Sequence, residues 1–252
     1  MATLFIGQNK VFLPETDSTN SYAINLLKNV NCIEGTVVYT DNQTQGKGQR
    51  GNTWHSESSM NITLSLILKP HFLASKNIFY LSKITSLALY DVLTECLGFG
   101  QFDIKIKWPN DMLVNRKKIA GVLIENSLLD NKINWSIIGI GFNVNQMQFA
   151  GLDTATSLKL LDQDHRSLDK IMDSIFIHFE KWYLKLKQNH LAEIDENYHN
   201  FLFGMHREMT FQSNGIQINA FVEGVSPEGL LRLRNENNHE QLYNMKEIAF
   251  VI

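Results

Sequence analysis

The sequence predicts an α+β fold in which a mixed β-sheet with helices is followed by a small all-β domain. Up to about residue 203, short β-branched and aromatic runs alternate with two long segments of helical periodicity. From residue 204 only short alternating runs remain, separated by turn sequences. The chain has 252 residues, 44% of them hydrophobic, which suffices for one large core. We therefore predict a larger domain over 1–203 and a smaller one over 204–252.

Strands are expected where apolar and polar residues alternate or β-branched residues cluster. The clearest case is 61–68, which has isoleucine or leucine at every even position and therefore one buried face. The turn Asn115-Arg116-Lys117 predicts a hairpin between 112–114 and 119–125. The remaining strands predicted for the larger domain are 10–13, 36–40, 103–108 and 135–140. Those predicted for the smaller domain are 208–212, 216–225, 230–234 and 248–252.

Helices are expected where apolar residues recur every three or four positions. Residues 77–97 have this pattern, and Gly98 and Gly100 end it. Residues 168–186 are strongly amphipathic, and a shorter helix is predicted over 191–200. A helix over 21–30, with Ala23, Leu26, Leu27 and Val30 on one face, is capped by Asp17 or Ser18.

Composition excludes several classes of protein. No segment is apolar enough to cross a bilayer, and the N-terminus lacks the basic and apolar regions of an export signal, which predicts a cytoplasmic protein. Cys32 and Cys96 have no CxxC partner, which argues against a zinc site or a disulfide framework. A net charge of -3, with no room for a helix-turn-helix before Asp17, disfavours DNA binding.

A glycine-rich loop occupies residues 46–51. It fits the pattern GxGxxG, but no helix is predicted directly after it and no Gly-Lys-Ser/Thr closes it, which excludes a dinucleotide fold and a Walker loop. The loop also carries Lys47 and Arg50, so it can bring backbone N–H groups and positive charge onto phosphate or carboxylate oxygens. An ordinary surface turn explains the loop equally well.

A second candidate lies where Pro109 ends a strand. Alternation places Lys105 and Lys107 on one face, and Asn110 and Asp111 then stand at the strand terminus. Asp111 offers a hard oxygen ligand for Mg²⁺ near ATP phosphates. The alternative is a plain Pro-Asn-Asp turn.

The third and fourth candidates are strands that contain a lysine or glycines. Lys118 opens an almost wholly apolar strand, where a lysine needs an anionic partner. Gly121 in that strand, and Gly139 and Gly141 in a later one, allow a ligand to approach the backbone, although close β-packing explains them as well. Motifs of nucleophilic catalysis are missing, so the chemistry must depend on positioning and charge.

Taken together and in this order, five motifs resemble those of the biotin–protein ligase family. They are Asp17-Ser18-Thr19-Asn20, the Gln-x-x-Gly-x-Gly-x-x-Gly run from Gln43 to Gly51, 107–111 (Lys-Trp-Pro-Asn-Asp), 118–125 (Lys-Ile-Ala-Gly-Val-Leu-Ile-Glu) and 139–143 (Gly-Ile-Gly-x-Asn). The resemblance implies a catalytic fold like that of class II aminoacyl-tRNA synthetases and an SH3-like β-barrel at the C-terminus. It also implies a two-step reaction in which biotin and ATP form biotinyl-AMP, assisted by Mg²⁺, and a lysine of an acceptor then takes the biotin.

The resemblance assigns roles to residues at matching positions. The implied biotin contacts are Ser18, Thr19, Asn20, Gln43, Gly46, Lys47, Gly48, Gln49, Lys118, Gly121, Leu123 and Gly139. The implied ATP contacts are Arg50, Trp54, Lys107, Asn110 and Asn143, with Trp54 stacking on adenine. Lys118 and Arg50 would act in catalysis, Asp111 would bind the metal ion, and the loop 46–51 would close over the adenylate.

Two departures from the family pattern carry their own predictions. The family loop usually reads Gly-Arg-Gly-Arg, whereas this chain has Lys47 and Gln49 before Arg50. Since lysine lacks the bidentate fork of arginine, we expect leakier retention of the adenylate. No DNA-binding domain precedes the motifs, which predicts a ligase without repressor function.

The resemblance also implies partners. The acceptor would be the biotin carboxyl carrier protein of acetyl-CoA carboxylase or a related carboxylase, and an exposed sheet edge would permit a homodimer. Two rivals stay open: a lipoate–protein ligase, and a non-catalytic binding module that retains the fold. Biotin-dependent exchange between ATP and pyrophosphate separates these readings.

Overall fold

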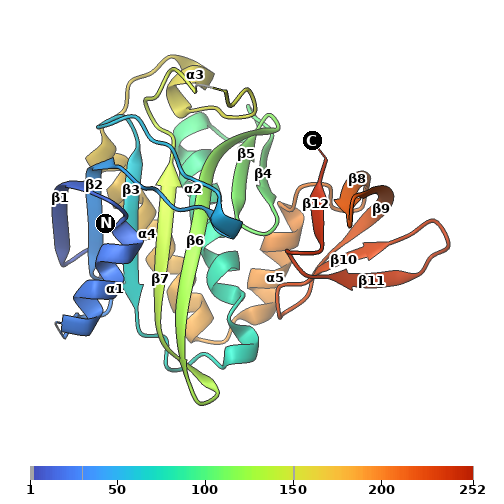
Figure 1. The fold of residues 1–252 in the computed structure, drawn as a ribbon, viewed down its shortest axis with the longest axis horizontal. Coiled ribbons are helices and arrows are strands. Elements are labelled where there is room, and N and C mark those ends of the chain that lie inside the picture. The colour runs from blue at the N-terminus through green and yellow to red at the C-terminus, as the bar shows by residue number, and fades with distance from the viewer. Residues whose placement is uncertain (1–2, 30, 150, 252) are drawn as a thin grey trace.

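The computed structural model describes residues 3–29, 31–149 and 151–251, with the side chain of Arg50 left out. A seven-stranded sheet forms the larger body in the order β1-β2-β3-β7-β6-β5-β4. A five-stranded sheet, β11-β10-β9-β8-β12, forms a C-terminal lobe beside it (Figure 1). Only β1 and β2 pair in parallel in the large sheet, so the mixed sheet and the second β unit confirm the predicted α+β class.

The strands of the large sheet lie close to their predicted positions. Their bounds are β1 Lys10–Thr16, β2 Val37–Gln43, β3 Ile62–Leu68, β4 Ile104–Lys107, β5 Asp111–Val114, β6 Lys117–Leu129 and β7 Lys132–Phe142. Asn115 and Arg116 have φ of 50° and 66°, as a tight hairpin turn requires, and join β5 to β6 as predicted. All seven residues of β3 are buried, because helices cover both faces of the strand and not only the face that the alternation predicts.

Helices cover the two faces of the sheet. Their bounds are α1 Thr19–Asn29, α2 Tyr80–Leu97, α3 Leu158–Asp162, α4 Leu168–Lys187 and α5 Leu191–Asn200, with short 3₁₀ turns at Gln49–Gly51 and Ser75–Asn77. Helix α1 packs in front of β2, β3 and β7, while α2 and α4 pack together behind the sheet (Figure 1). The front layer buries Ala23 against Val38, Ile67 and Ile137. Val30, expected on the same helical face, lies outside the described residues.

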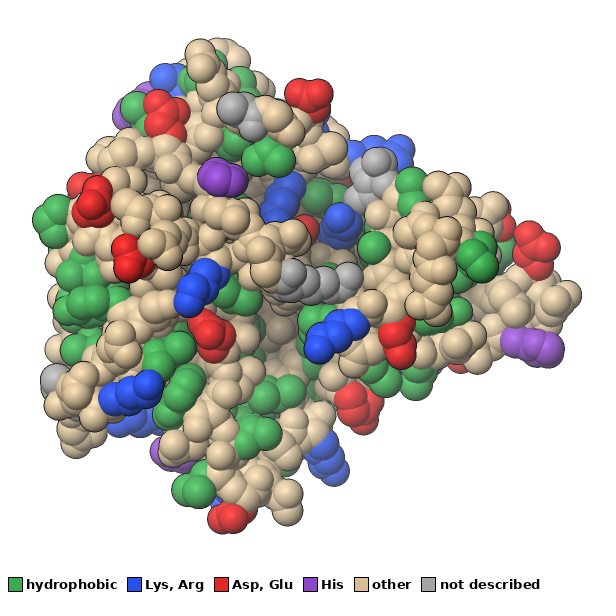
Figure 2. Space-filling view, in the orientation of Figure 1, with side chains coloured by type: hydrophobic (Ala, Val, Ile, Leu, Met, Phe, Trp, Pro, Cys, Tyr) green, Lys and Arg blue, Asp and Glu red, His purple; other side chains and the backbone are tan. Residues whose placement is uncertain are grey.

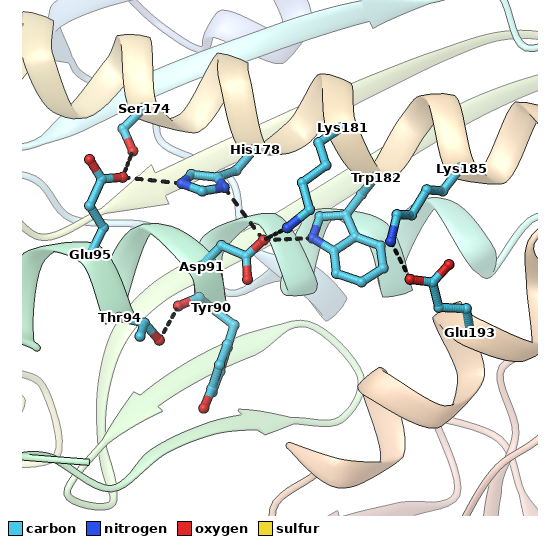
Figure 3. Close-up of polar contacts among 10 residues, drawn as sticks. All are labelled: Tyr90, Asp91, Thr94, Glu95, Ser174, His178, Lys181, Trp182, Lys185 and Glu193. Carbon is cyan, nitrogen blue, oxygen red and sulfur yellow. Dashed lines mark hydrogen bonds and ion pairs between the residues drawn. The ribbon is translucent and has the colours of Figure 1, made fainter. Parts of the chain in front are cut away.

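A polar network joins α2 to α4 at the rear of the molecule (Figure 3). Asp91 Oδ2 accepts hydrogen bonds from Lys181 Nζ and Trp182 Nε1, both at 2.9 Å. His178 lies between two carboxylates, with Nδ1 3.4 Å from Asp91 Oδ2 and Nε2 3.1 Å from Glu95 Oε2. Asp91, and then Glu95, raise the pKa of His178 against the opposing effect of burial. The network therefore adds charge-dependent stability to an otherwise apolar helix pair.

The C-terminal lobe begins at Glu208 in β8 and is held against the segment 107–111. Its strands are β8 Glu208–Ser213, β9 Ile216–Val225, β10 Leu231–Arg234, β11 Glu240–Tyr243 and β12 Ile248–Phe250. Before it, the linker extends the sheet at β4, where Ile106 N donates to Phe201 O (2.9 Å) and Phe203 N donates to Ile106 O (2.8 Å). The buried Trp108 Nε1 donates to Gly229 O of the lobe at 3.0 Å. Ile252, the last residue of the predicted final strand, lies outside the described residues, and the boundary at residue 204 stays a prediction.

Candidate active site

A cavity of about 130 Å³ opens on the front of the large sheet, between the 46–54 loop and strands β5 to β7. Figure 2 shows the hollow, with Lys and Arg side chains along its edge toward the C-terminal lobe. Most predicted site residues line it: Ser18, Thr19, Asn20, Gln43, Lys47, Gly48, Gln49, Trp54, Asn110, Asp111, Lys118, Gly121, Leu123 and Gly139. Fold topology thus brings together motifs that are more than 100 positions apart in the sequence.

One end of the cavity is polar. Ser18, Thr19 and Asn20 stand at the start of α1, where the chain leaves β1, and all three are buried. Gln43 ends the neighbouring β2, and its Oε1 accepts from Thr19 N at 2.9 Å. Gln43 Oε1 is therefore used within the protein, which leaves the amide Nε2 of Gln43 to face the cavity as a donor.

Asn20 lies flat on the floor of this polar end. A Cβ on Gly139 would come within 2.4 Å of Asn20 Oδ1, so glycine is needed at 139 for the amide to lie there. The contact with Asn20 shows close packing at Gly139. Access of a ligand to the backbone, the other explanation that the sequence offers, stays a prediction.

The cation predicted to act in catalysis has an anionic partner. Lys118 Nζ lies 2.7 Å from Asp111 Oδ1. The angles fall outside hydrogen-bond geometry, and Asp111 Oδ1 has no hydrogen-bond donor among the described residues. Asn110 is anchored beside it, since its Nδ2 donates to Val122 O at 2.7 Å. Burial lowers the pKa of nearby Lys107, and Lys118 lowers it further, while Asp111 opposes them.

Trp54 fills much of the cavity. Gly121 and Gly141 face each other across β6 and β7, and the indole lies on this pair of glycines. A Cβ on Gly141 would be 2.3 Å from Trp54 Cε2, and one on Gly121 would be 3.2 Å from Trp54 Cζ3. The cavity is smaller than the roughly 300 Å³ usual for ligand sites, because the ring occupies the space. Lys118 Nζ lies 5.5 Å from the ring centroid, within reach of a cation–π contact.

Three predicted residues whose side chains the structure describes do not line the cavity. These residues are Lys107, Asn143 and Gly46, and Gly46 packs against Trp54, whose backbone O would lie 2.2 Å from a Cβ at 46. Asn143 is buried and donates through Nδ2 to Thr156 O at 3.0 Å, whereas its Oδ1 has no donor among the described residues. The side chain of Arg50 lies outside the described part of the chain, so the role of Arg50 stays a prediction. Lys47 lines the cavity, but its ammonium donates to Ser21 Oγ at 2.8 Å.

Some lining residues have no ligand contact assigned to them in the sequence prediction. They are Asn52, Thr53, Thr63, Leu64, Val122, Ile140 and Gly141. Gly141 had a signal, a second glycine in an apolar strand, but no sequence pattern indicates that it faces Trp54. Thr63 and Leu64 read as ordinary strand residues.

Helices of the described chain are all too short or too polar to span a membrane.

The comparisons with known proteins agree with this geometry. The model of the biotin/lipoate A/B protein ligase family matches residues 12–143. The chain is 30% identical over 248 residues to the bifunctional ligase/repressor BirA of Bacillus spizizenii, covering 97% of this chain and 75% of that protein. It is 28% identical to the biotin–[acetyl-CoA-carboxylase] ligase of Paracoccus denitrificans, covering 88% of this chain and 92% of that one.

A solved structure shows the same fold over nearly the whole chain. It is the biotin protein ligase of Aquifex aeolicus in complex with biotin and ATP, with a TM-score of 0.80 and 25% identity, covering 97% of this chain and 99% of that one. The order of the motifs, the residues that line the cavity, the family match and the fold all indicate the same family. The chain belongs to the biotin/lipoate A/B protein ligase family, and within it to the biotin–protein ligases.

Proposed function

We propose that this protein activates biotin with ATP as biotinyl-5'-AMP and then transfers the biotin to a lysine of a carboxylase carrier domain. The observation that carries the proposal is the Lys118–Asp111 pair, whose charged atoms are 2.7 Å apart. The pair lines the same cavity as the polar residues at the start of α1 and the glycines Gly121 and Gly141. This arrangement supports a role for Lys118 as the cation that holds the carboxylate and the phosphate together.

In the first step a biotin carboxylate oxygen attacks the α-phosphorus of ATP, and the bond to the bridging oxygen of pyrophosphate breaks. Negative charge gathers on the phosphoryl oxygens as the two anions approach. Lys118 would hold the carboxylate and then these oxygens, which lowers the barrier through charge that is already in place. Gly121 and Gly141 allow the adenylate to lie against the backbone, once Trp54 has left that surface.

In the second step the neutral amine of the acceptor lysine attacks the acyl carbon of biotinyl-AMP. An amide bond forms, AMP leaves with the electron pair of the acyl–oxygen bond, and the amine loses a proton. The enzyme supplies alignment and charge neutralisation, the contributions that such group transfer needs most.

The nucleotide end of the site fits ATP and a divalent cation. Asn143 Oδ1 is buried and has no donor among the described residues, so an amino group such as that of adenine would satisfy it. Magnesium is usually bound by one or two carboxylates together with substrate phosphates, and Asp111 is the carboxylate available here. The ion would neutralise phosphate charge, with Asn110 beside it.

The polar end of the cavity favours biotin over lipoate. Ser18, Thr19, Asn20 and Gln43 present hydrogen-bonding groups, which suit a ureido ring and have no partner on a dithiolane. A non-catalytic module would have no use for the Lys118–Asp111 pair, or for a buried Asn143 whose Oδ1 has no donor in the described part of the chain.

Biotin-dependent ATP–pyrophosphate exchange tests the proposal. The wild-type protein should exchange only with biotin present, and Lys118→Ala should reduce kcat/KM at least about 100-fold, as loss of a charge-stabilising group does. Lys105→Ala is the matched control, since Lys105 has a similar side-chain exposure, 33% against 37%, but does not line the cavity. Equal activity of the two variants, or exchange without biotin, would contradict the assignment.

A further inference from the structure

The amide of Asn20 has a fixed orientation in the polar end of the cavity. Its Nδ2 carries two N–H donors, and both are used within the protein: one reaches Glu125 Oε2 at 2.8 Å and the other Leu123 O at 3.3 Å. The oxygens of Glu125 and Leu123 accept these two bonds, so the contacts fix which way the amide faces. What Asn20 can offer to a ligand is therefore its oxygen.

Behind Asn20 a buried serine holds that oxygen. Ser65 is fully buried in β3, and its Oγ lies 2.6 Å from Asn20 Oδ1. Since Oδ1 can only accept, Ser65 must donate its single proton to it. One lone pair of Asn20 Oδ1 is then left for the cavity, which Asn20 lines while Ser65 and Glu125 do not.

Counting protons in the same way indicates the hydrogen-bonding role of the Thr19 hydroxyl. The Ser65 and Thr19 hydroxyls are 2.8 Å apart, and Gln43 Oε1 lies 3.3 Å from Thr19 Oγ1. With the Ser65 proton committed to Asn20, both of these acceptors are available to the Thr19 hydroxyl. When Thr19 donates to either of them, it presents a lone pair to the cavity, which it lines together with Asn20.

We propose that Ser65 and Glu125 are positioning residues that turn Thr19 and Asn20 into acceptors and thereby make the cavity select head groups with N–H donors. The inference rests on the proposed function and specifies its selectivity. The urea of biotin carries two N–H groups, whereas a dithiolane carries none. A buried acceptor left without a donor disfavours the wrong ligand more than a missing apolar contact does.

The test measures biotin binding and selectivity in Ser65→Ala and Glu125→Ala. Glu125→Ala removes an acceptor that orients the Asn20 amide, and Ser65→Ala removes the donor that holds its oxygen in place. In each case we expect the biotin KM to rise about ten-fold with kcat within about two-fold of wild type, the size of one lost buried hydrogen bond. Two biotin analogues, each with one urea N–H replaced by oxygen, serve as competitors. The variants should lose most of the wild-type preference for biotin over at least one analogue.

Two further variants separate positioning from folding. Glu125→Gln keeps an acceptor and should restore the wild-type KM. Ser136→Ala removes an equally buried serine whose Oγ donates to Asn126 Oδ1 at the same 2.6 Å but outside the cavity, and it should leave KM and selectivity unchanged.

Each outcome decides a different point. If Ser65→Ala weakens biotin and both analogues alike, or if Glu125→Gln fails like Glu125→Ala, the positioning role is refuted while the ligase function stands. Should the wild-type protein show no biotin-dependent exchange, the proposed function itself fails.

Discussion

Trp54 is the residue whose position has to change for the proposed reaction. Its indole lies on Gly121 and Gly141, and its buried Nε1 has no acceptor among the described residues. A cavity of about 130 Å³ cannot accept an adenylate while the ring stays there. Because a buried donor without an acceptor costs free energy, the Nε1 group makes it less costly for the Trp54 ring to move away from the glycines.

We therefore predict that biotin and Mg-ATP together change the tryptophan fluorescence of the protein. The chain has four tryptophans, and Trp54→Phe should abolish the change because the other three do not line the cavity. A change of the same size in Trp54→Phe would mean that another part of the molecule responds.

Among single residues, the sequence could predict those cavity-lining residues that belong to short, contiguous motifs. Lys118, Asp111 and Asn110 belong to short segments whose composition is unusual for a strand end, and the structure brings them into one cavity. Ser65 could not be found this way, because a serine in an alternating strand reads as solvent-facing. Its burial depends on α1, which crosses over β3 from a distant part of the chain. Contacts such as Trp54 on Gly141 also depend on how the loop folds back.

At the element scale, the long periodic segments were the most predictable. The bounds of α5 and β9 agree with the predicted ranges, and those of α2 and α4 differ only at their ends. The helix α3 and the strand β11 were missed for physical reasons. Helix α3 has five residues, too few to show a period, and β11 is largely exposed, so no alternation marks it. These elements owe their structure to neighbours and not to local pattern.

The pair of α2 and α4 should depend on pH through His178. The pKa of His178 is raised in the folded protein, mainly by Asp91, so protonated His178 stabilises the fold below the unfolded pKa near 6.5. This contribution is lost as pH rises through the raised folded pKa. The His178→Gln change should therefore lower the free energy of unfolding by about 1 kcal/mol at pH 5.5, allowing for partial solvent screening, and by less at pH 8.5.

Urea denaturation at both pH values measures this difference. His239→Gln, at an exposed turn of the C-terminal lobe, is the control and should show the same small effect at each pH. A destabilisation by His178→Gln that grows with pH would contradict the stabilising role of protonated His178.

At the scale of the whole molecule, the C-terminal lobe is joined to the catalytic body at Gly229. Its carbonyl accepts from Trp108, the residue two positions before Asn110, and a Cβ at 229 would be 2.4 Å from the Phe79 ring. Gly229 also has a φ of 92°, which side chains rarely adopt. The lobe thus contacts the same short segment that supplies Asn110 and Asp111.

We expect Gly229→Ala to lower the free energy of unfolding by about 2–3 kcal/mol, through backbone strain together with the steric clash. The matched control is Gly215→Ala, where φ is 81° but nothing lies within 4 Å of the added Cβ. This control should cost only the strain, about 1 kcal/mol. Similar losses in both variants would show that the clash of the added Cβ with Phe79 costs no stability, which would contradict tight packing at Gly229.

The central claim is that the cavity activates biotin and passes it to a carrier lysine. The most direct measurement incubates the purified protein with Mg-ATP, a biotin carboxyl carrier domain and either biotin or lipoate, and then determines the intact mass of the acceptor. The account predicts a gain equal to one biotinyl group with biotin, none with lipoate, and none with either acid for Lys118→Ala. A lipoyl gain, or an unmodified acceptor in the presence of biotin, would contradict it.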